Sequence, residues 1–229
     1  MADAIISRYL DHAVLKPELS RQEAEEAIKL GIKYKVRTVC VRPCDIELAV
    51  QLCRGTETQV SCVLAFPHGD TLSEIKAQEA RLYIEKGTDE IDMVVNYGYI
   101  RSGLWKLVEE DVLAVSRITK AEGIPLKVIL ETNKLTAEEI SEATEIAITA
   151  GADYVKTSTG FNGPGATKEA VEVMVKTADG RIKVKASGGI RNYEQAKAFV
   201  DMGCDRLGNG YSSTPAICDG APEAKGEAY

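Results

Sequence analysis

The sequence predicts an α/β protein, a single (β/α)8 TIM barrel formed by residues 1–229. Short apolar stretches alternate with amphipathic ones about every 25 to 30 residues, which is typical of parallel strands joined by helices. The length suits one such barrel, and a hydrophobic content of 45% is enough for a large core. The first strand is not followed by Gly-x-Gly-x-x-Gly, which argues against a dinucleotide-binding fold.

The first four units follow from apolar strands and helix start signals. Ser20 and Glu23 form a capping-box pattern that opens a helix running to about Tyr34. Thr71 and Glu74 form a second such pattern, whose helix ends near residue 87. A shorter helix is expected around residues 49–53. The strands of these units are expected at residues 10–15, 38–42, 60–65 and 90–95.

The last four units follow the same alternation. A long helix over residues 104–122 is closed by Gly123 and Pro125, and Thr136 with Glu139 opens a helix that stops at Gly151. The remaining strands are expected at residues 127–130, 154–157, 182–186 and 206–207, and the remaining helices at 167–177 and 192–202. The tail from about residue 219 is polar and rich in small residues, so we expect it to be mobile.

Composition excludes several classes of partner. A net charge of -7 argues against a nucleic-acid footprint, which is normally basic. No apolar run approaches the roughly 20 residues that span a bilayer, and the amino-terminal residues lack a signal-peptide pattern. Six cysteines without a Cys-x-x-Cys pair indicate reduced, mostly buried thiols, and two histidines offer little for a zinc site. We therefore expect a cytoplasmic protein with no membrane, nucleic-acid or metal partner.

Charged residues near the ends of apolar strands indicate the site. Lys156 ends the sixth strand, Lys185 lies in the seventh, Asp92 in the fourth and Asp11 in the first. In a barrel of this type the active site forms at the carboxyl ends of the strands. Burying a charge without a partner is costly, so these side chains are expected to meet there. A buried ion network without chemistry is the structural alternative.

Lys156 is the candidate nucleophile. A free lysine has a pKa of about 10.4, so about one amine in 2,500 is unprotonated at pH 7. Burial together with a neighbouring ammonium lowers such a pKa, and Lys185 is the expected neighbour. Asp92 would then hold Lys185 and pass protons with it through a water molecule.

Glycine-rich turns after the last three strands predict a phosphate site. Backbone N–H groups that converge in such turns bind anions, and the loops after the seventh and eighth strands are the usual phosphate position of this fold. The residues expected to bind the substrate and its phosphate are Thr157, Gly160, Gly188, Gly189, Arg191, Gly210, Ser212 and Ser213.

Several other residues are open to two interpretations. His12 and His68 are more typical of scaffold hydrogen bonds than of acid–base catalysis. Trp105 is expected to pack a helix rather than to bind a ligand. Glu131, at the end of the fifth strand, is either a loop anchor or part of the site's electrostatics.

With these residues in view, nearly the whole chain resembles the deoxyribose-phosphate aldolases, a family of lysine aldolases. The resemblance is carried by the following stretches: residues 10–12, 15–17, 39–41, 66–67, 89–95, 127–132, 151–160 and 184–191. It implies reversible cleavage of 2-deoxyribose 5-phosphate to glyceraldehyde 3-phosphate and acetaldehyde through a lysine Schiff base, with no metal or other cofactor. We also expect a homodimer or homotetramer.

The resemblance implies a role for five residues. Lys156 would form the Schiff base with the C1 aldehyde, Lys185 would lower its pKa and share protons, and Asp92 would relay them. Asp11 would hold the region of the substrate hydroxyl, and Tyr229 corresponds to a terminal tyrosine that assists enamine protonation in some members.

Two departures from the family pattern accompany the resemblance. Arg42 stands where relatives often carry a small polar residue, and residues 208–214 replace a shorter phosphate-binding loop. Two rival functions are a phosphosugar isomerase that uses a carboxylate base without an imine, and a catalytically silent phosphosugar-binding barrel. Trapping with borohydride and acetaldehyde separates the aldolase from the isomerase.

Overall fold

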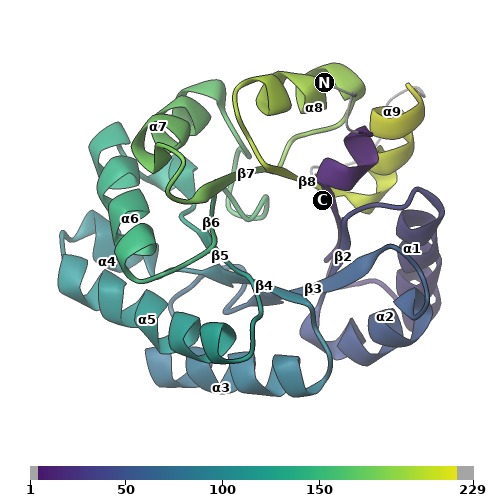
Figure 1. The fold of residues 1–229 in the computed structure, drawn as a ribbon, viewed down its shortest axis with the longest axis horizontal. Coiled ribbons are helices and arrows are strands. Elements are labelled where there is room, and N and C mark those ends of the chain that lie inside the picture. Colours follow the sequence, from purple (N-terminus) through teal and green to yellow (C-terminus); the bar gives the residue numbers. More distant parts are fainter. Residues whose placement is uncertain (1–4, 221–229) are drawn as a thin grey trace.

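The computed structural model describes residues 5–220, which form a closed barrel of eight parallel strands surrounded by helices (Figure 1). Each strand pairs with its neighbours in the chain, and β8 closes the ring by pairing with β1. The strands are β1 (Leu10–Val14), β2 (Thr38–Val41), β3 (Gln59–Leu64), β4 (Glu90–Val94), β5 (Leu126–Ile129), β6 (Tyr154–Lys156), β7 (Lys183–Ser187) and β8 (Arg206–Gly210). The predicted (β/α)8 TIM barrel is confirmed.

Helices follow the strands in the order that the sequence predicts. They are α1 (Arg21–Lys33), α2 (Ile46–Cys53), α3 (Ser73–Glu85), α4 (Tyr97–Arg101), α5 (Trp105–Ala121), α6 (Ala137–Thr149), α7 (Lys168–Ala178), α8 (Tyr193–Asp201) and α9 (Thr214–Asp219). Short 3-10 helices lie at Ile6–Tyr9, Pro43–Asp45, Thr132–Lys134 and Tyr211–Ser213.

Two of the three predicted capping boxes are confirmed, at the starts of α1 and α6. The third, between Thr71 and Glu74, is wrong. Helix α3 begins after Leu72, whose side chain offers no cap, so Thr71 lies one residue too early to accept from the first turn. The first residue of the helix, Ser73, donates its hydroxyl instead to Asp111 Oδ1 of α5, 2.9 Å away.

The end of the barrel also differs from the prediction. Gly208 and Gly210 lie inside β8 rather than in a loop after it, and Gly210 pairs with Ala13 of β1. A side chain at position 208 would place its Cβ only 2.3 Å from Ser187 Oγ, so the close contact of β7 with β8 requires glycine there. Helix α9, which the sequence analysis did not predict, continues to Asp219. The predicted mobile tail beyond it falls on residues 221–229, outside the described residues.

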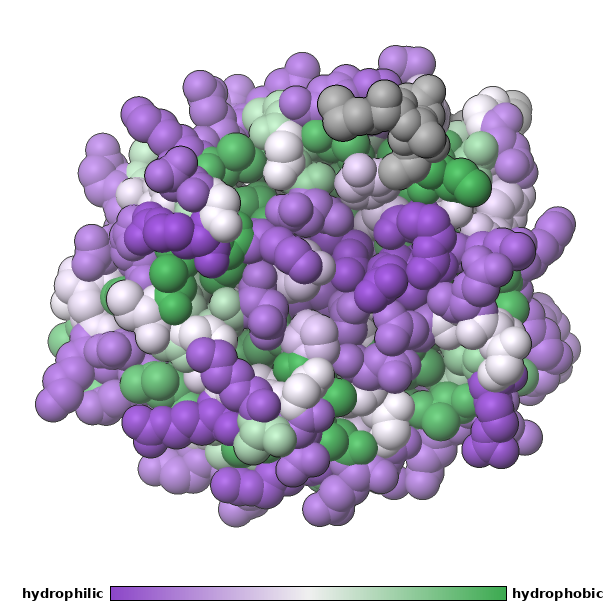
Figure 2. All heavy atoms as spheres, in the orientation of Figure 1, coloured by the Kyte–Doolittle hydropathy of each residue, from purple (hydrophilic) through white to green (hydrophobic). Residues whose placement is uncertain are grey.

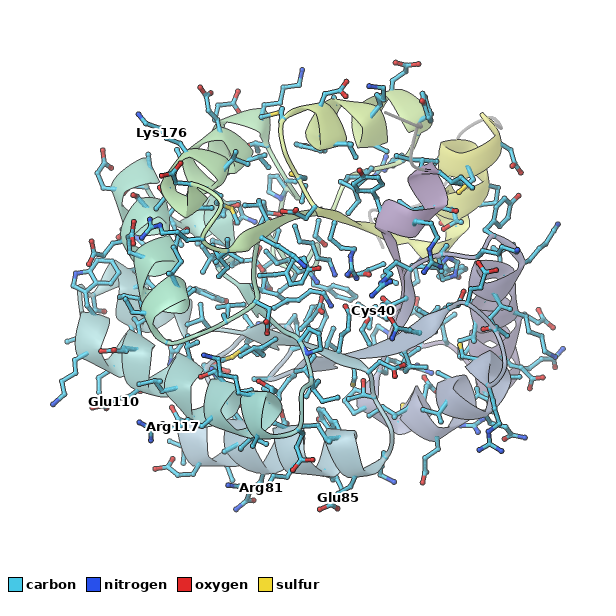
Figure 3. All side chains as sticks on the ribbon, in the orientation of Figure 1. Cys40, Arg81, Glu85, Glu110, Arg117 and Lys176 are labelled. Atoms are coloured by element: carbon cyan, nitrogen blue, oxygen red, sulfur yellow. The ribbon has the colours of Figure 1, made fainter. Side chains whose placement is uncertain are left out.

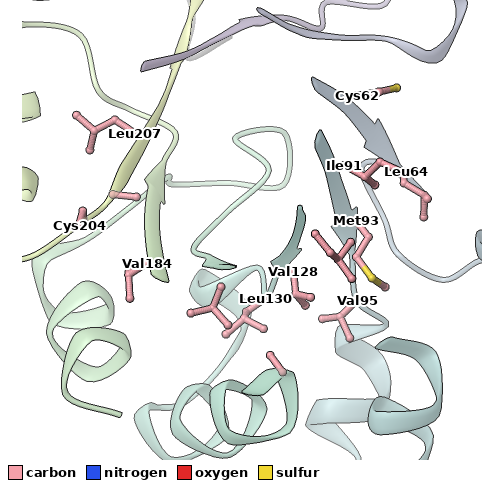
Figure 4. Close-up of a cluster of buried hydrophobic side chains, with 14 of the residues drawn as sticks. Cys62, Leu64, Ile91, Met93, Val95, Val128, Leu130, Val184, Cys204 and Leu207 are labelled. Carbon is pink, nitrogen blue, oxygen red and sulfur yellow. The ribbon is translucent and has the colours of Figure 1, made fainter. Parts of the chain in front are cut away.

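The strands present apolar side chains to the helices, and this layer forms most of the hydrophobic core. Figure 4 shows Met93, Val95, Val128 and Leu130 directed from the strands toward the surrounding helices. Burying a side chain of this size stabilises the fold by about 1.5–3 kcal/mol. The core therefore lies outside the ring of strands, which leaves the interior of the ring for other residues.

The surface carries no large apolar area on the face that Figure 2 shows. Figure 2 shows a mostly hydrophilic face on which hydrophobic residues form small separate groups. Within residues 5–220, no helix is long and apolar enough to cross a membrane. Four of the six cysteines are buried and none of the six forms a disulfide, in agreement with the predicted free, mostly buried thiols.

Candidate active site

The interior of the barrel is charged rather than apolar. Because side chains alternate across a strand, one residue in two points inward, and several of these inward positions carry a charge. Seven charged residues from six strands are buried here: Asp11, Glu90, Asp92, Lys127, Lys156, Lys185 and Arg206. Four of them, Asp11, Asp92, Lys156 and Lys185, are the predicted catalytic residues that lie within residues 5–220.

Asp92 is the centre of this group. Its Oδ2 accepts from Lys156 Nζ at 2.8 Å and from Lys185 Nζ at 2.7 Å, and its Oδ1 accepts from Lys127 Nζ at 2.7 Å. Lys156 and Lys185 are also direct partners in the register of β6 and β7. The two ammonium groups therefore share one oxygen and lie within two hydrogen-bond lengths of each other, as the proposed lysine pair requires.

Asp11 binds the same group from β1. Its Oδ2 accepts from Lys185 Nζ at 2.5 Å, and its Oδ1 accepts from Arg206 Nη1 and from the Thr38 hydroxyl. Burial would raise the pKa of Asp11, but the cations of Arg206, Lys185 and Lys127 hold it below its ordinary value. Asp11 is therefore an anion that fixes Lys185.

Three members of the group were not identified from the sequence: Glu90, Lys127 and Arg206. Lys127 Nζ lies 2.5 Å from Glu90 Oε2, and Arg206 Nη1 donates to the same oxygen at 2.9 Å. Each is a charged residue in an otherwise apolar strand, which is the signal that identified Lys156. Applied to every strand, that signal would have found them.

The ion pairs in the barrel interior are unevenly distributed. Within the described part of the chain, Lys127 contacts three carboxylates, and Lys185 and Arg206 contact two each. Lys156 contacts only the carboxylate of Asp92, which it shares with two other lysines. The seven residues comprise four cations and three carboxylates, so loss of one proton neutralises the group. Lys156 is the cation held by the fewest carboxylates.

The expected direction of the Lys156 pKa is not confirmed. Burial lowers the pKa of this lysine, but the Asp92 carboxylate opposes burial and keeps the pKa above its ordinary value. The same neighbourhood holds the pKa of Asp92 well below its usual range, because Lys127, Lys156 and Lys185 surround it despite its burial. The expectation failed because Asp92 contacts Lys156 directly as well as Lys185. Because its pKa lies above the ordinary value, Lys156 is a protonated amine at neutral pH.

The loops after β6 and β7 meet closely, as the predicted phosphate site requires. A Cβ at Gly188 would lie 2.8 Å from the Cα of Gly165 and 3.4 Å from that of Gly160. The amide of Ala166 donates to the carbonyl of Ser187 at 3.0 Å. The backbones of the two loops are thus in contact, with no side chains between them, next to the ends of β6 and β7, which carry Lys156 and Lys185.

The other predicted phosphate residues lie in different settings. The Thr157 hydroxyl donates to the carbonyl of Ser187 and accepts from its amide, so it joins β6 to β7. Gly189 has open space where a side chain would be, and Arg191 follows it before α8. Gly210 lies within β8, and Ser212 and Ser213 lie in the 3-10 helix before α9. Tyr229 lies outside the described residues.

His12 is a scaffold residue. The carbonyl of Ala27 can only accept, so His12 Nε2 carries the proton and donates to it at 2.9 Å, while Nδ1 accepts from the Thr214 hydroxyl at 2.8 Å. Thr214 in turn accepts from Asn209 Nδ2. The ring thus joins β1 to α1 and α9, on the outer side of the barrel wall.

We expect His12 to make the stability of the protein depend on pH. Burial lowers its pKa from 6.5 to about 4, so below pH 6.5 the unfolded chain binds a proton that the folded protein excludes. The contribution is complete above pH 6.5 and is lost as pH falls toward 4, by an amount on the order of 3 kcal/mol. Urea unfolding between pH 7 and 5 measures it. His12→Gln should flatten this slope; an unchanged slope would contradict the assignment.

A cavity of about 460 Å³ opens beside the ends of β1, β2 and β3. Its wall includes Leu15, Phe66 and Phe161, and the exposed His68 lies at its edge. Arg42 also lines it, and one guanidinium nitrogen donates to three main-chain carbonyls of residues 16, 17 and 19. This departure from the family pattern therefore holds the loop after β1.

The prediction for Trp105 is confirmed, and two labelled side chains mark the inside and the outside of the ring of strands. Trp105 is partly buried and packs against the core at the start of α5, as expected for helix packing. Figure 3 shows Cys40 within the ring of strands, whereas Lys176 projects from the outer helices. The inside of the ring and its outer surface are thus chemically distinct.

Fold and site together define a (β/α)8 barrel enzyme with buried lysines held by carboxylates inside its ring of strands. Residues 5–219 match the model of the DeoC/LacD family aldolases, and the chain belongs to this family.

Individual relatives agree with that assignment. The chain is 41% identical to a deoxyribose-phosphate aldolase of Clostridium perfringens, over 94% of this chain and 95% of the relative. Its structure is similar to that of the aldolase QR15, with a TM-score of 0.88, 40% identity and 96% of each chain covered. The tetrameric deoxyribose phosphate aldolase of Aeropyrum pernix gives a TM-score of 0.85 at 27% identity, over 93% of this chain and 89% of that chain.

Proposed function

We propose that this protein reversibly cleaves 2-deoxyribose 5-phosphate to glyceraldehyde 3-phosphate and acetaldehyde through a Schiff base on Lys156. The observation that carries the assignment is the sharing of one Asp92 oxygen by Lys156 and Lys185. It places the amine of Lys156 beside both a carboxylate and a second cation. The family and the names of the relatives supply the reaction and the substrate.

The proposed reaction begins at the Lys156 amine. Asp92 takes the ammonium proton, the free amine adds to the C1 aldehyde, and loss of water leaves a protonated imine. The imine accepts the electron pair of the C2–C3 bond as the C3 hydroxyl loses its proton, and glyceraldehyde 3-phosphate departs. Protonation of the enamine at C2 and hydrolysis release acetaldehyde and restore the lysine.

Other residues assist in this proposal. Lys185, fixed by Asp11 and Asp92, carries a proton between these groups and water. Asp11 lies beside the same lysine and would hold the hydroxyl region of the substrate. The phosphate would bind at the adjoining loops after β6 and β7, where Gly160 and the exposed Gly189 carry no side chain and their backbone N–H groups can face an anion. The Gly188 amide already donates to the carbonyl of Gly208.

An assay of aldehyde release from 2-deoxyribose 5-phosphate, with borohydride trapping, tests the proposal. The aldolase releases acetaldehyde, and borohydride with acetaldehyde leaves a two-carbon adduct on Lys156 that peptide mass spectrometry locates. An isomerase on the same scaffold forms no imine, so it releases no acetaldehyde and leaves no adduct; its own substrate would be a phosphosugar with a hydroxyl on C2. Substrate binding without product would identify a silent binding barrel, and either result would reject the proposal.

Lys185→Leu should shift the pH dependence of the reaction. Without Lys185, Lys156 no longer shares its Asp92 oxygen with a second ammonium group on β7, so the pKa of Lys156 rises further. We expect the acid limb of kcat/KM to move up by about one pH unit, with turnover reduced about 10²-fold. A pH–rate profile that extends above the ordinary lysine pKa of 10.5 measures both. A limb at the wild-type pH would exclude coupling between the two lysines.

We infer the oligomeric state and the location of the protein from less specific observations. A homodimer or homotetramer is proposed because a structural relative is described as tetrameric. A cytoplasmic location is proposed because the chain has six cysteines and no disulfide within its described part. Its small-molecule partners would be the phosphosugar and the two aldehydes.

A further inference from the structure

Glu131 is a buried carboxylate that the proposed reaction does not use. It follows Leu130, the first residue after β5, and its backbone has a φ of 59°, in the left-handed region that glutamate rarely adopts. The residue has no exposed surface. A buried carboxylate on strained backbone requires strong compensating interactions.

Those interactions come from the loop after β6. Glu131 Oε2 accepts from the Thr159 hydroxyl at 2.5 Å, the Thr159 amide at 3.4 Å and Asn162 Nδ2 at 3.2 Å. Its other oxygen accepts from Asn133 Nδ2 at 3.1 Å. One carboxylate thus accepts four hydrogen bonds, three of them from the segment 159–162. These hydrogen bonds connect Glu131 to the loop and to Asn133 rather than to the lysines of the site.

The loop held by Glu131 spans the opening of the barrel. Asn162 Nδ2 also donates to the carbonyl of Pro67, in the loop after β3, at 2.8 Å. Next to it, Phe161 packs edge to face against Phe66, with ring centroids 5.1 Å apart. The segment that follows Lys156 is therefore connected to the opposite wall of the ring.

The same loop supplies one side of the proposed phosphate site. Gly160 lies between Thr159 and Phe161. A Cβ at Gly188 would contact the Cα atoms of both Gly165 and Gly160, so the backbones of the three glycines lie side by side. Nothing but glycine fits between these backbones without a shift. The position of the Gly160 amide thus depends on the bonds that Glu131 makes to its preceding neighbour.

We propose that Glu131 is the positioning residue of the loop 159–165, and that it sets the affinity of the site for the phosphate of the substrate. The inference rests on the proposed function, which it deepens. The catalytic group of Asp92, Lys156 and Lys185 is held by separate bonds inside the ring. Loss of Glu131 should therefore weaken binding far more than it slows chemistry.

Glu131→Gln tests this with little change in shape. One of the two acceptor oxygens becomes an amide that donates, and it then faces groups that also donate. We expect KM for 2-deoxyribose 5-phosphate to rise about tenfold and kcat to stay within about threefold of wild type. Inorganic phosphate, measured by calorimetry, should bind about tenfold more weakly.

Glu139→Gln is the matched control. Glu139 is a half-buried member of the capping box of α6 and lies outside the loop. It should lower the melting temperature and leave KM and phosphate affinity unchanged. Asn162→Ala removes one donor to Glu131 and the link to Pro67, and should raise KM about threefold. It carries the test if Glu131→Gln does not fold.

The outcomes separate the two proposals. Wild-type KM and phosphate affinity in the folded Glu131 and Asn162 variants would overturn the positioning role, and equal losses in kcat would do the same. If the wild-type protein binds phosphate but releases no aldehyde, the proposed function fails. The phosphate affinities of the variants then still decide the role of Glu131.

Discussion

Lys156→Ala is expected to abolish aldol cleavage while the protein remains folded. The variant lacks the amine that forms the imine, and removing a covalent nucleophile typically costs at least about 10⁴-fold in turnover. It also removes a buried cation that contacts only one carboxylate, so Asp92 keeps its bonds to Lys127 and Lys185. Acetaldehyde release, borohydride trapping and circular dichroism measure the three expectations.

Lys176→Ala is the matched control, because Lys176 is exposed on α7 and projects from the outer surface (Figure 3). It should match the wild type in all three measurements. Substantial turnover in Lys156→Ala, or a borohydride adduct on another lysine, would show that the nucleophile has been assigned to the wrong residue.

Asp92→Asn is expected to have the second-largest effect, on both activity and stability. The neutral amide cannot take a proton from Lys156, so turnover should fall about 10²–10⁴-fold. Removing one member of a buried ion network also leaves cations without a partner, which typically costs about 3–5 kcal/mol of unfolding free energy. Kinetics and urea unfolding at pH 7 measure the two losses.

The same variant should shift the titration of Lys156 downward. Asp92 is the carboxylate that keeps the pKa of this lysine above its ordinary value, and without it burial and the remaining cations favour the neutral amine. Borohydride trapping should therefore begin at a lower pH than in the wild type, although turnover is slow.

Asp201→Asn is the control for Asp92→Asn, because Asp201 pairs with Lys197 on the exposed side of α8. It should leave turnover, stability and trapping pH nearly unchanged, since an exposed pair contributes about 0.2–1 kcal/mol. A trapping midpoint in Asp92→Asn equal to or above that of the wild type would contradict the electrostatic role of Asp92.

The charged interior explains how a barrel of this size provides a reactive amine. Most of the apolar core lies between strands and helices, so the inward positions are free for charged groups that fix one another. Asp11, Glu90 and Asp92 hold Lys127 and Lys185 from several sides. Lys156 has one carboxylate contact and needs one proton transfer to become reactive. It differs in this from Lys127 and Lys185, each of which is held by at least two carboxylates.

Much of this site could be predicted from the sequence because parallel strands end at one edge of a barrel. A charge in an apolar strand must find a partner in the ring, and the partners of Lys156 and Lys185 are the predicted Asp92 and Asp11. Lys127 and Arg206 gave the same signal but lie near the starts of β5 and β8, where no adjoining loop motif drew attention to them.

The sequence by itself determined the order of strands and helices, the closed barrel and the strand-borne charges that meet inside it, because strand period and helix caps are local properties. Only the tertiary structure decided which carboxylate each lysine contacts, that β8 includes Gly208 and Gly210, and that Glu131 binds the loop after β6. These depend on distances between segments far apart in the chain. The direction of the Lys156 pKa is the clearest case, because it follows from a contact with an oxygen that is 64 residues away in sequence.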